Sequence, residues 1–181
     1  MTAEQQLQPA GVLTLADVVR FNYFHLSRFW FVPAFVFAFS VFDLFAVLRT
    51  GDPERLQNPG SSYLIGLAFS MLMFGSPYLG AWLQFAKLAY FRGPVRYHLT
   101  SDRIRLEGAA FSSEIGWTLV QNVYETNGAF LIYQSAQVAW ILPKRFFWGQ
   151  DALVQRCRQL MQQRLSRPGL FHAPTWRGTW L

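Results

Sequence analysis

The sequence has little charge for its length. Only 14% of the 181 residues are Asp, Glu, Lys or Arg, while 52% are hydrophobic and 18% aromatic. A soluble globular domain carries about a quarter charged residues. This deficit argues against an ordinary soluble domain and favours a protein with a large part of its surface in lipid.

Cysteine, histidine and catalytic motifs are also scarce. The single cysteine, Cys157, excludes an internal disulfide and agrees with a reducing compartment. The three histidines (25, 98 and 172) are far apart and have no acidic or cysteine partner at ligand spacing, so we expect no metal site. No Gly-x-Ser-x-Gly, phosphate-binding glycine loop or His-Glu-x-x-His is present. We therefore expect no catalytic residue and no cofactor, and the sequence does not predict an enzyme.

The sequence contains two long apolar runs. Residues 29–48 contain one charge, Asp43, and residues 63–86 contain none. A helix rises about 1.5 Å per residue, so each run can cross the roughly 30 Å of a bilayer's hydrocarbon. The turn-rich loop 51–60 joins them. These features predict a transmembrane hairpin over 29–92, with spans of about 29–48 and 63–88.

The second run also contains small residues and a proline. Gly66 and Ser70 have the spacing that lets membrane helices approach closely. We expect them to pack against the first span, although another protomer is an alternative. Pro77 is expected to kink the helix.

Positive residues predict the orientation of this hairpin. They are concentrated before the first span and after the second, at positions 20, 28, 87, 92, 96, 103 and 105. Because cytoplasmic flanks are rich in Lys and Arg, both termini are expected in the cytoplasm. A cleaved signal peptide is not expected, since the first cation is Arg20 and the first span is too long. The predicted location is the bacterial inner membrane, with a multi-pass topology.

The N-terminal segment, residues 1–28, is expected to contain a helix. Thr14 and Asp17 have the spacing of a helix-capping pattern. The aromatic residues and two arginines that follow suit the headgroup region, so the helix is expected either at the membrane interface or packed on the cytoplasmic domain.

After Pro94 the periodicity changes from helical to alternating. Alternation and turn signals, including the hairpin signal Asn127-Gly128, predict about six short strands over 95–142. They are expected to form one antiparallel sheet or a partly open barrel. Residues 150–165 have helical spacing, with Cys157 toward the sheet and Arg158 facing away. The fold class is thus α+β, with a β domain over 93–165 closed by a C-terminal helix, and 166–181 as a tail.

Several stretches resemble the YcxB-like membrane protein family. One is TLADVVRFNYFHLSRFW before the hairpin. Others form a pattern in the second half, consisting of Trp117, Glu125, Phe130, Leu131, Tyr133, Ile141, Leu142, Pro143, Lys144, Arg145 and Phe147. The resemblance covers roughly residues 14–165. It implies a cytoplasmic domain similar to a pleckstrin-homology (PH) fold, and it implies no reaction, cofactor or catalytic residue.

Two places are candidate sites. Asp43 is the only acid in a predicted span, and such groups are often functional, but a capping or water-facing role near the outer boundary is the favoured interpretation. The second is the end of the last predicted strand, where Pro143 stops the strand. Lipid or partner contact is predicted for the five residues that follow, which are Lys144, Arg145, Phe146, Phe147 and Trp148. The alternative is a strand-to-helix join packed by its aromatic residues.

Function follows from this architecture only in outline. The favoured hypothesis is an adaptor or regulatory subunit that binds a protein partner, the lipid bilayer surface or both. An oligomeric transport or channel component, built from several copies of the hairpin, is the alternative. An immunity-like inhibitor of a membrane-acting toxin is a lesser one. Nucleic acid is not an expected partner, because the basic residues are scattered among apolar strand positions.

Overall fold

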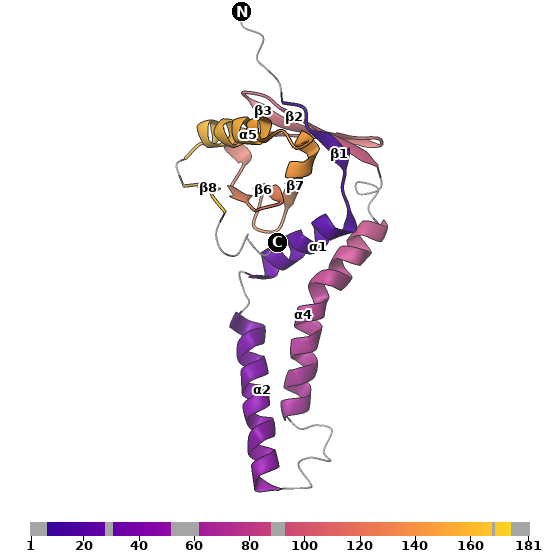
Figure 1. Cartoon of the computed structure of the whole chain (residues 1–181), viewed down its shortest axis with the longest axis vertical. Coiled ribbons are helices and arrows are strands. Elements are labelled where there is room, and N and C mark those ends of the chain that lie inside the picture. Colours follow the sequence, from indigo (N-terminus) through magenta and orange to yellow (C-terminus); the bar gives the residue numbers. More distant parts are fainter. Residues whose placement is uncertain (1–6, 28–30, 52–61, 88–92, 168, 175–181) are drawn as a thin grey trace, which may run out of the picture.

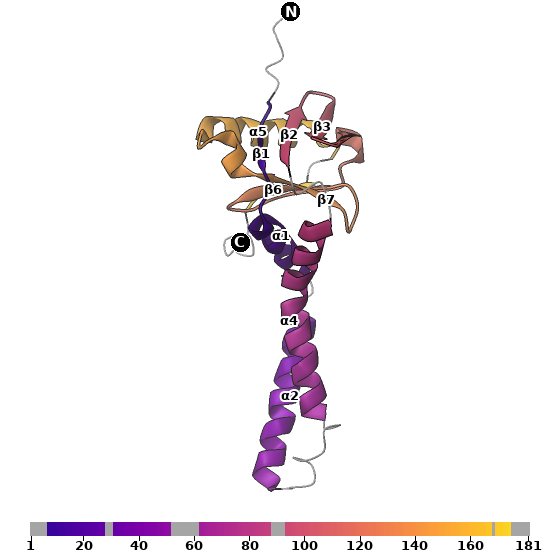
Figure 2. The ribbon, with the colours of Figure 1, turned by 90° about the vertical axis from the view of Figure 1, so that its right-hand side faces the viewer.

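Two long helices carry a β domain at one end. A third helix, α1, lies between this pair of helices and the β domain (Figures 1 and 2). The computed structural model describes residues 7–27, 31–51, 62–87, 93–167 and 169–174. The helices are α1 (Leu15–Leu26), α2 (Phe31–Thr50), α4 (Ser62–Lys87) and α5 (Asp151–Arg164), with the 3-10 turns η3 (Trp117–Leu119) and η4 (Lys144–Phe147). The strands are β1 (Ala10–Val12), β2 (Pro94–Leu99), β3 (Arg103–Gly108), β4 (Phe111–Gly116), β5 (Asn122–Glu125), β6 (Ala129–Tyr133), β7 (Ala139–Pro143) and β8 (Phe171–His172).

The helices α2 and α4 are the two predicted apolar segments. Both are long and apolar enough to cross a membrane, and they pack against each other as a hairpin. Most of their side chains are exposed, Phe35 at 73% and Met71 at 78% among them. The predicted residues 29–30 and 88, and the predicted loop apart from Gly51, lie outside the described residues.

Small residues bring α2 and α4 into contact. A Cβ atom added to Gly66 would lie 1.8 Å from the hydroxyl oxygen of Ser40. Ser40 and Ser70 are both buried, and their hydroxyls donate to the carbonyls of Val36 and Gly66 at 2.7 and 2.8 Å. The predicted packing of Gly66 against the first span is therefore confirmed, and these serines are satisfied within the helices themselves.

The C-terminal part of α4 bends away from α2 and meets α1 (Figure 1). Pro77 lies inside α4 and has no N–H, so the carbonyl of Met73 loses its helical donor. The hydroxyl of Ser76 donates to that carbonyl instead, at 2.9 Å. From α1, the amide of Asn22 donates to the carbonyl of Pro77 at 3.1 Å, and the hydroxyl of Tyr23 donates to that of Phe74 at 2.9 Å. Side chains of α1 thus occupy the region of the proline.

The helix α1 begins with the predicted cap. The carboxylate of Asp17 accepts hydrogen bonds from the backbone N–H and the hydroxyl of Thr14, at 2.7 and 2.8 Å. Val18 and Phe24 are buried in the core that α1 shares with the β domain. Packing on the domain, one of the two predicted positions for this helix, is what the structure shows.

The β domain contains two four-stranded sheets, in the orders β1-β2-β3-β4 and β7-β6-β5-β8. The six predicted strands correspond to β2 through β7, but the expectation of a single antiparallel sheet is wrong, because they divide between two sheets. After β4 the chain turns through η3 with Trp117 buried, and the next strand starts a second sheet. β1 and β8 lie outside the predicted segment 93–165, and each pairs with a strand inside it, β8 in parallel with β5.

The core lies between the two sheets and under α5. Tyr97 on β2 is buried, and its hydroxyl donates to the carbonyl of Ile141 on β7 at 2.6 Å, which joins the sheets. Trp117 and Trp140 are buried, as predicted. Cys157 and Met161 close the core from α5. The closing helix is therefore confirmed, and Cys157 is inaccessible while α5 is in place.

Candidate functional site

Glu125, at the end of β5, is the central charge of a buried cluster. Its side chain is 0% exposed and accepts from two cations that belong to different elements. Lys144 of η4 lies 2.7 Å from Oε1, and Arg158 of α5 donates through Nε to Oε2 at 2.6 Å and through Nη2 to Oε1 at 2.5 Å. The carboxylate of Glu125 therefore links β5 to η4 and to α5 by ion pairs.

The hydrogen bonds of this cluster decide its protonation. Burial alone would raise the pKa of Glu125, but hydrogen bonds from Arg158 and Lys144 outweigh it and hold that pKa below its ordinary value. The hydrogen bond between Glu125 and Arg158 also raises the pKa of Arg158. Burial, together with the nearby Glu125 charge, raises the pKa of the Cys157 thiol to about 12. Glu125 is therefore a charged structural group at neutral pH, and Cys157 is an unreactive thiol.

A second ion pair joins α1 to η4. Arg145 donates through Nη1 and Nη2 to the two carboxylate oxygens of Asp17, at 2.5 and 2.6 Å, and through Nη2 to the carbonyl of Val12 at 2.9 Å. Burial would raise the pKa of Asp17, but the hydrogen bonds from Arg145 and Thr14 lower it below its ordinary value. The pair is bidentate, which is the strongest geometry for an arginine and a carboxylate.

The pH dependence of stability should reveal this pair. Because the pKa of Asp17 is lowered on folding, its contribution is present above the ordinary pKa of about 3.9 and is lost as the pH falls through the folded value. We expect Asp17→Asn to be less stable at neutral pH by about 1 kcal/mol, a value kept small because the Arg145 side chain is 45% exposed. The difference from the wild type should shrink toward acid in urea titrations. Glu114→Gln, in an exposed pair with Arg103, is the control. A difference that stays constant with pH would contradict this assignment.

The structure separates the five residues predicted to contact lipid or a partner. Phe146 and Phe147 are buried at 3% and 1%, so they pack the join between strand and helix. Lys144 and Arg145 hold Glu125 and Asp17. Trp148 is 80% exposed. The packed join is therefore present, while contact with lipid or a partner stays a prediction for the side chains that reach the surface.

Trp148 is unusual in its backbone as well as its exposure. Its φ is 56°, in the left-handed region that bulky residues rarely adopt. It caps η4 before Gly149, which has a φ of 73°. Strain of this kind persists only where the surrounding structure imposes it, and it is frequent at functional sites.

An open cavity of about 520 Å³ lies beside this tryptophan, between η4 and α5. We call it the Trp148 cavity. Its lining consists mostly of polar side chains, from Asn127, Lys144, Arg145, Trp148, Gly149, Asp151, Val154, Gln155 and Arg158. The volume falls in the range of about 300–1,000 Å³ that is typical of ligand pockets. The structure thus places three of the five predicted contact residues around one cavity.

The acids that balance these cations lie beneath them. Glu125 is 0% exposed and Asp17 7% exposed, whereas Lys144, Arg145 and Arg158 are 21%, 45% and 26% exposed. Asp151 is the acid on the lining itself, at the start of α5, where the helix dipole favours it. A molecule entering the cavity would meet N–H donors and an indole ring more often than carboxylates.

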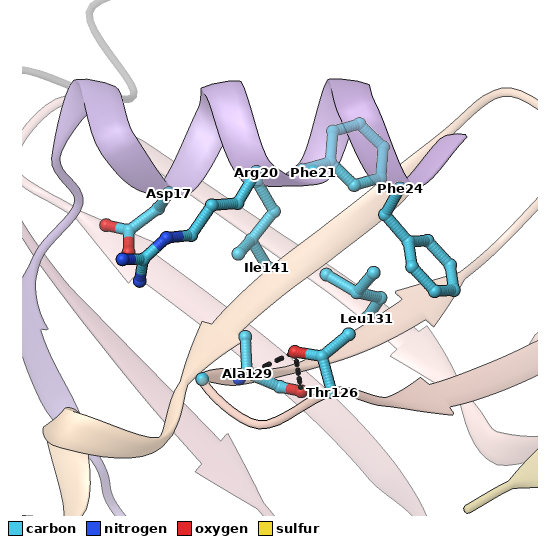
Figure 3. Close-up of a pocket in the computed structure, with 9 residues that line it drawn as sticks. Asp17, Arg20, Phe21, Phe24, Thr126, Ala129, Leu131 and Ile141 are labelled. Carbon is cyan, nitrogen blue, oxygen red and sulfur yellow. Dashed lines mark hydrogen bonds between the residues drawn. The ribbon is translucent and has the colours of Figure 1, made fainter. Parts of the chain in front are cut away.

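A smaller cavity lies under α1, with Asp17 among the residues that line it (Figure 3). Its volume of about 20 Å³ is enough for one water molecule. The side chains of Phe21 and Phe24 from α1 and of Leu131 and Ile141 from the sheet line it. Gly128 lines this cavity and the adjacent Asn127 lines the larger one, so the turn between β5 and β6 contributes to both.

Asp43 lies in α2 and is partly buried. Asp43 is far along the chain from the groups around Trp148. Both a functional role and the favoured capping or water-facing role stay predictions. Among the described residues, no group of three or more His, Cys, Asp or Glu side chains could hold a metal ion.

Sequence reasoning missed the acids that organise the site. The capping pattern accounts for Asp17 without predicting its ion pair. Helical periodicity predicts that Arg158 faces away from the domain, and this is wrong because Arg158 bonds to Glu125. The available signal was Glu125 itself, an acid that ends a strand and is followed by buried apolar residues of β6 and by Lys144 and Arg145.

The model of the YcxB-like protein family matches residues 99–161. The resemblance is therefore confirmed over this segment, which includes β3 through β7, Glu125, both cations of η4 and most of α5. The two apolar helices before it fit the predicted hairpin. The searches of curated proteins and of solved structures give no match.

Proposed function

From the YcxB-like segment and the contacts around it, we propose that this protein is a membrane-held adaptor or regulatory subunit. Its β domain binds an extended segment of a protein partner at the Trp148 cavity. The observation that carries this proposal is an 80% exposed tryptophan, in a left-handed backbone conformation, at the edge of a cavity of about 520 Å³. Exposed tryptophans beside pockets are frequent hot spots of protein interfaces.

Membrane insertion of the hairpin is part of the proposal. Only 17% and 22% of the apolar windows of α2 and α4 are buried, which supports insertion into a bilayer over a role as core helices of a soluble domain. Lipid would cover side chains such as Phe35, Phe42 and Met71. With the positive residues on both outer flanks, the hairpin would place both termini in the cytoplasm, and in a bacterium this is the inner membrane.

A PH-like domain is the second part. The six strands β2 to β7, divided between the two four-stranded sheets and followed by a helix that closes the core, support this likeness. The Trp148 cavity lies where η4 meets the closing helix α5.

A protein partner suits the site better than the bilayer surface does. In both overall views β6 and β7 lie between α1 and α5, and α1 is the element next to the hairpin (Figures 1 and 2). Most of the cavity lining comes from η4 and α5, and no residue of the hairpin helices α2 and α4 is part of it. Because its lining offers mainly donors, the partner segment should carry carboxylate or carbonyl acceptors.

Photocrosslinking in cells that make the protein tests this proposal. A benzophenone amino acid at position 148 should give one defined adduct, whose mapped partner segment contains Asp or Glu. The same group at position 119, where Leu119 is 66% exposed, should not give it. Gln155→Trp, which fills the cavity from the exposed side of α5, should abolish the adduct. The absence of any adduct at position 148 above that at 119 would refute the partner site, and a symmetric oligomer in detergent would then favour the channel alternative.

A further inference from the structure

The carbonyls around the proline of α4 are contacted by α1. Pro77 breaks the regular bonding of α4, and the two nearby carbonyls of Phe74 and Pro77 accept from Tyr23 and Asn22. Gly80, one turn further along α4, also lies beside Asn22, since an added Cβ there would be in van der Waals contact with the Asn22 amide nitrogen at 3.6 Å. Any change in the bend of α4 at Pro77 would therefore displace the α4 carbonyls to which Tyr23 and Asn22 of α1 donate.

The other end of α1 is bonded to the wall of the Trp148 cavity. Asp17 holds Arg145 by two hydrogen bonds, and Arg145 also holds the carbonyl of Val12 at the end of β1. Arg145 lines the cavity and is three residues before Trp148. The N–H of Trp148 donates to the carbonyl of Arg145 at 3.1 Å, so a displacement of Arg145 would move the tryptophan's backbone.

Between these two ends α1 is a short continuous helix. It has 12 residues, and Val18 and Phe24 are buried against the domain core. A helix of 12 residues is about 18 Å long, and its backbone hydrogen bonds link each turn to the next along its whole length. The helix α1 therefore contacts α4 through Asn22 and Tyr23 and contacts the cavity wall through Asp17.

We propose that α1 couples the bend of α4 at Pro77 to the shape of the Trp148 cavity. A change in the hairpin would be transmitted through Asn22 and Tyr23 to Asp17, then through Arg145 to Trp148. Its biological meaning rests on the proposed function, in which the cavity binds a partner. The coupling itself can be measured without any partner, so the two proposals fail separately.

Fluorine NMR of the full-length protein in nanodiscs, with 5-fluorotryptophan at its seven tryptophans, tests the coupling. Trp82 lies on α4 and reports the helix, while Trp148 reports the cavity. Each resonance is assigned from its Trp→Phe variant. Pro77→Ala should shift both resonances. Adding Asp17→Asn to Pro77→Ala should leave the shift of Trp82 and remove that of Trp148, measured relative to Asp17→Asn alone.

Gly75→Ala is the matched control, because an added Cβ there has no atom within 4 Å, and it should leave Trp148 unchanged. Tyr23→Phe removes one bond of α1 to α4 without altering α4's own sequence, and it should also shift Trp148. If neither Pro77→Ala nor Tyr23→Phe moves the Trp148 resonance, the coupling is refuted. A shift that persists in the double variant would refute the route through Asp17.

Discussion

Glu125→Ala is expected to lower the free energy of unfolding by about 3–4 kcal/mol. The Glu125 side chain is 0% exposed and is the shared partner of Lys144 and Arg158. Removing one member of a buried ion pair typically costs about 3–5 kcal/mol, because the remaining charge stays in a poorly solvated place. The lower part of that range applies here, since Lys144 and Arg158 are 21% and 26% exposed and can turn toward water.

The single cysteine provides the measurement. Cys157 is fully buried, and burial raises its thiol pKa to about 12, so it reacts with a maleimide only after α5 has opened. Labelling rates of Glu125→Ala and wild type at one pH give the ratio of their open populations. The control is Glu114→Ala, whose partner Arg103 is 56% exposed and whose loss should cost less than about 1 kcal/mol. Equal labelling rates for the Glu125 and Glu114 variants would show that the buried cluster does not hold α5.

Glu125 also shows how far the sequence predicts this site. Pro143, the two cations and the aromatic residues after them indicate that a strand ends and that the residues beyond it are unusual. Which of them reach the surface depends on the 3-10 turn η4, where Phe146 and Phe147 point into the core. Helical periodicity predicted that Arg158 faces water, because a periodic pattern sorts residues by polarity and contains no information about one buried acid on another strand.

Most strands of the fold could be predicted from the sequence, whereas their pairing into sheets could not. Alternation indicates which face of a strand is buried, and it found all six strands from β2 to β7. It does not indicate which strands pair across a break, so the division into two sheets at Trp117 was missed. β1 and β8 have three and two residues, too few for any alternation, and they are defined only by their pairing with β2 and β5.

Gly66→Leu is expected to separate α2 from α4. A Cβ at this position would lie 1.8 Å from the hydroxyl of Ser40, and although a serine can rotate, the Ser40 Cβ is only 3.1 Å away. Leucine adds three further carbons to the same place, so the helices must move apart by roughly 2 Å, the difference between small and large contacts in helix pairs. Overpacking of this kind typically costs about 1–3 kcal/mol.

Spin labels at positions 41 and 69, in a Cys157→Ala background, measure this separation in nanodiscs. Val41 and Phe69 are 44% and 41% exposed on α2 and α4, so labels there should not disturb the contact. The distance distribution should lengthen and broaden in Gly66→Leu. Gly75→Leu is the matched control, because its Cβ would meet no atom within 4 Å, and it should reproduce the parent distribution. An unchanged distribution in Gly66→Leu would mean that the hairpin does not close through Ser40 and Gly66. A change in Gly75→Leu alone would instead show that the open side of α4 packs against a second copy of the chain, as the channel alternative requires.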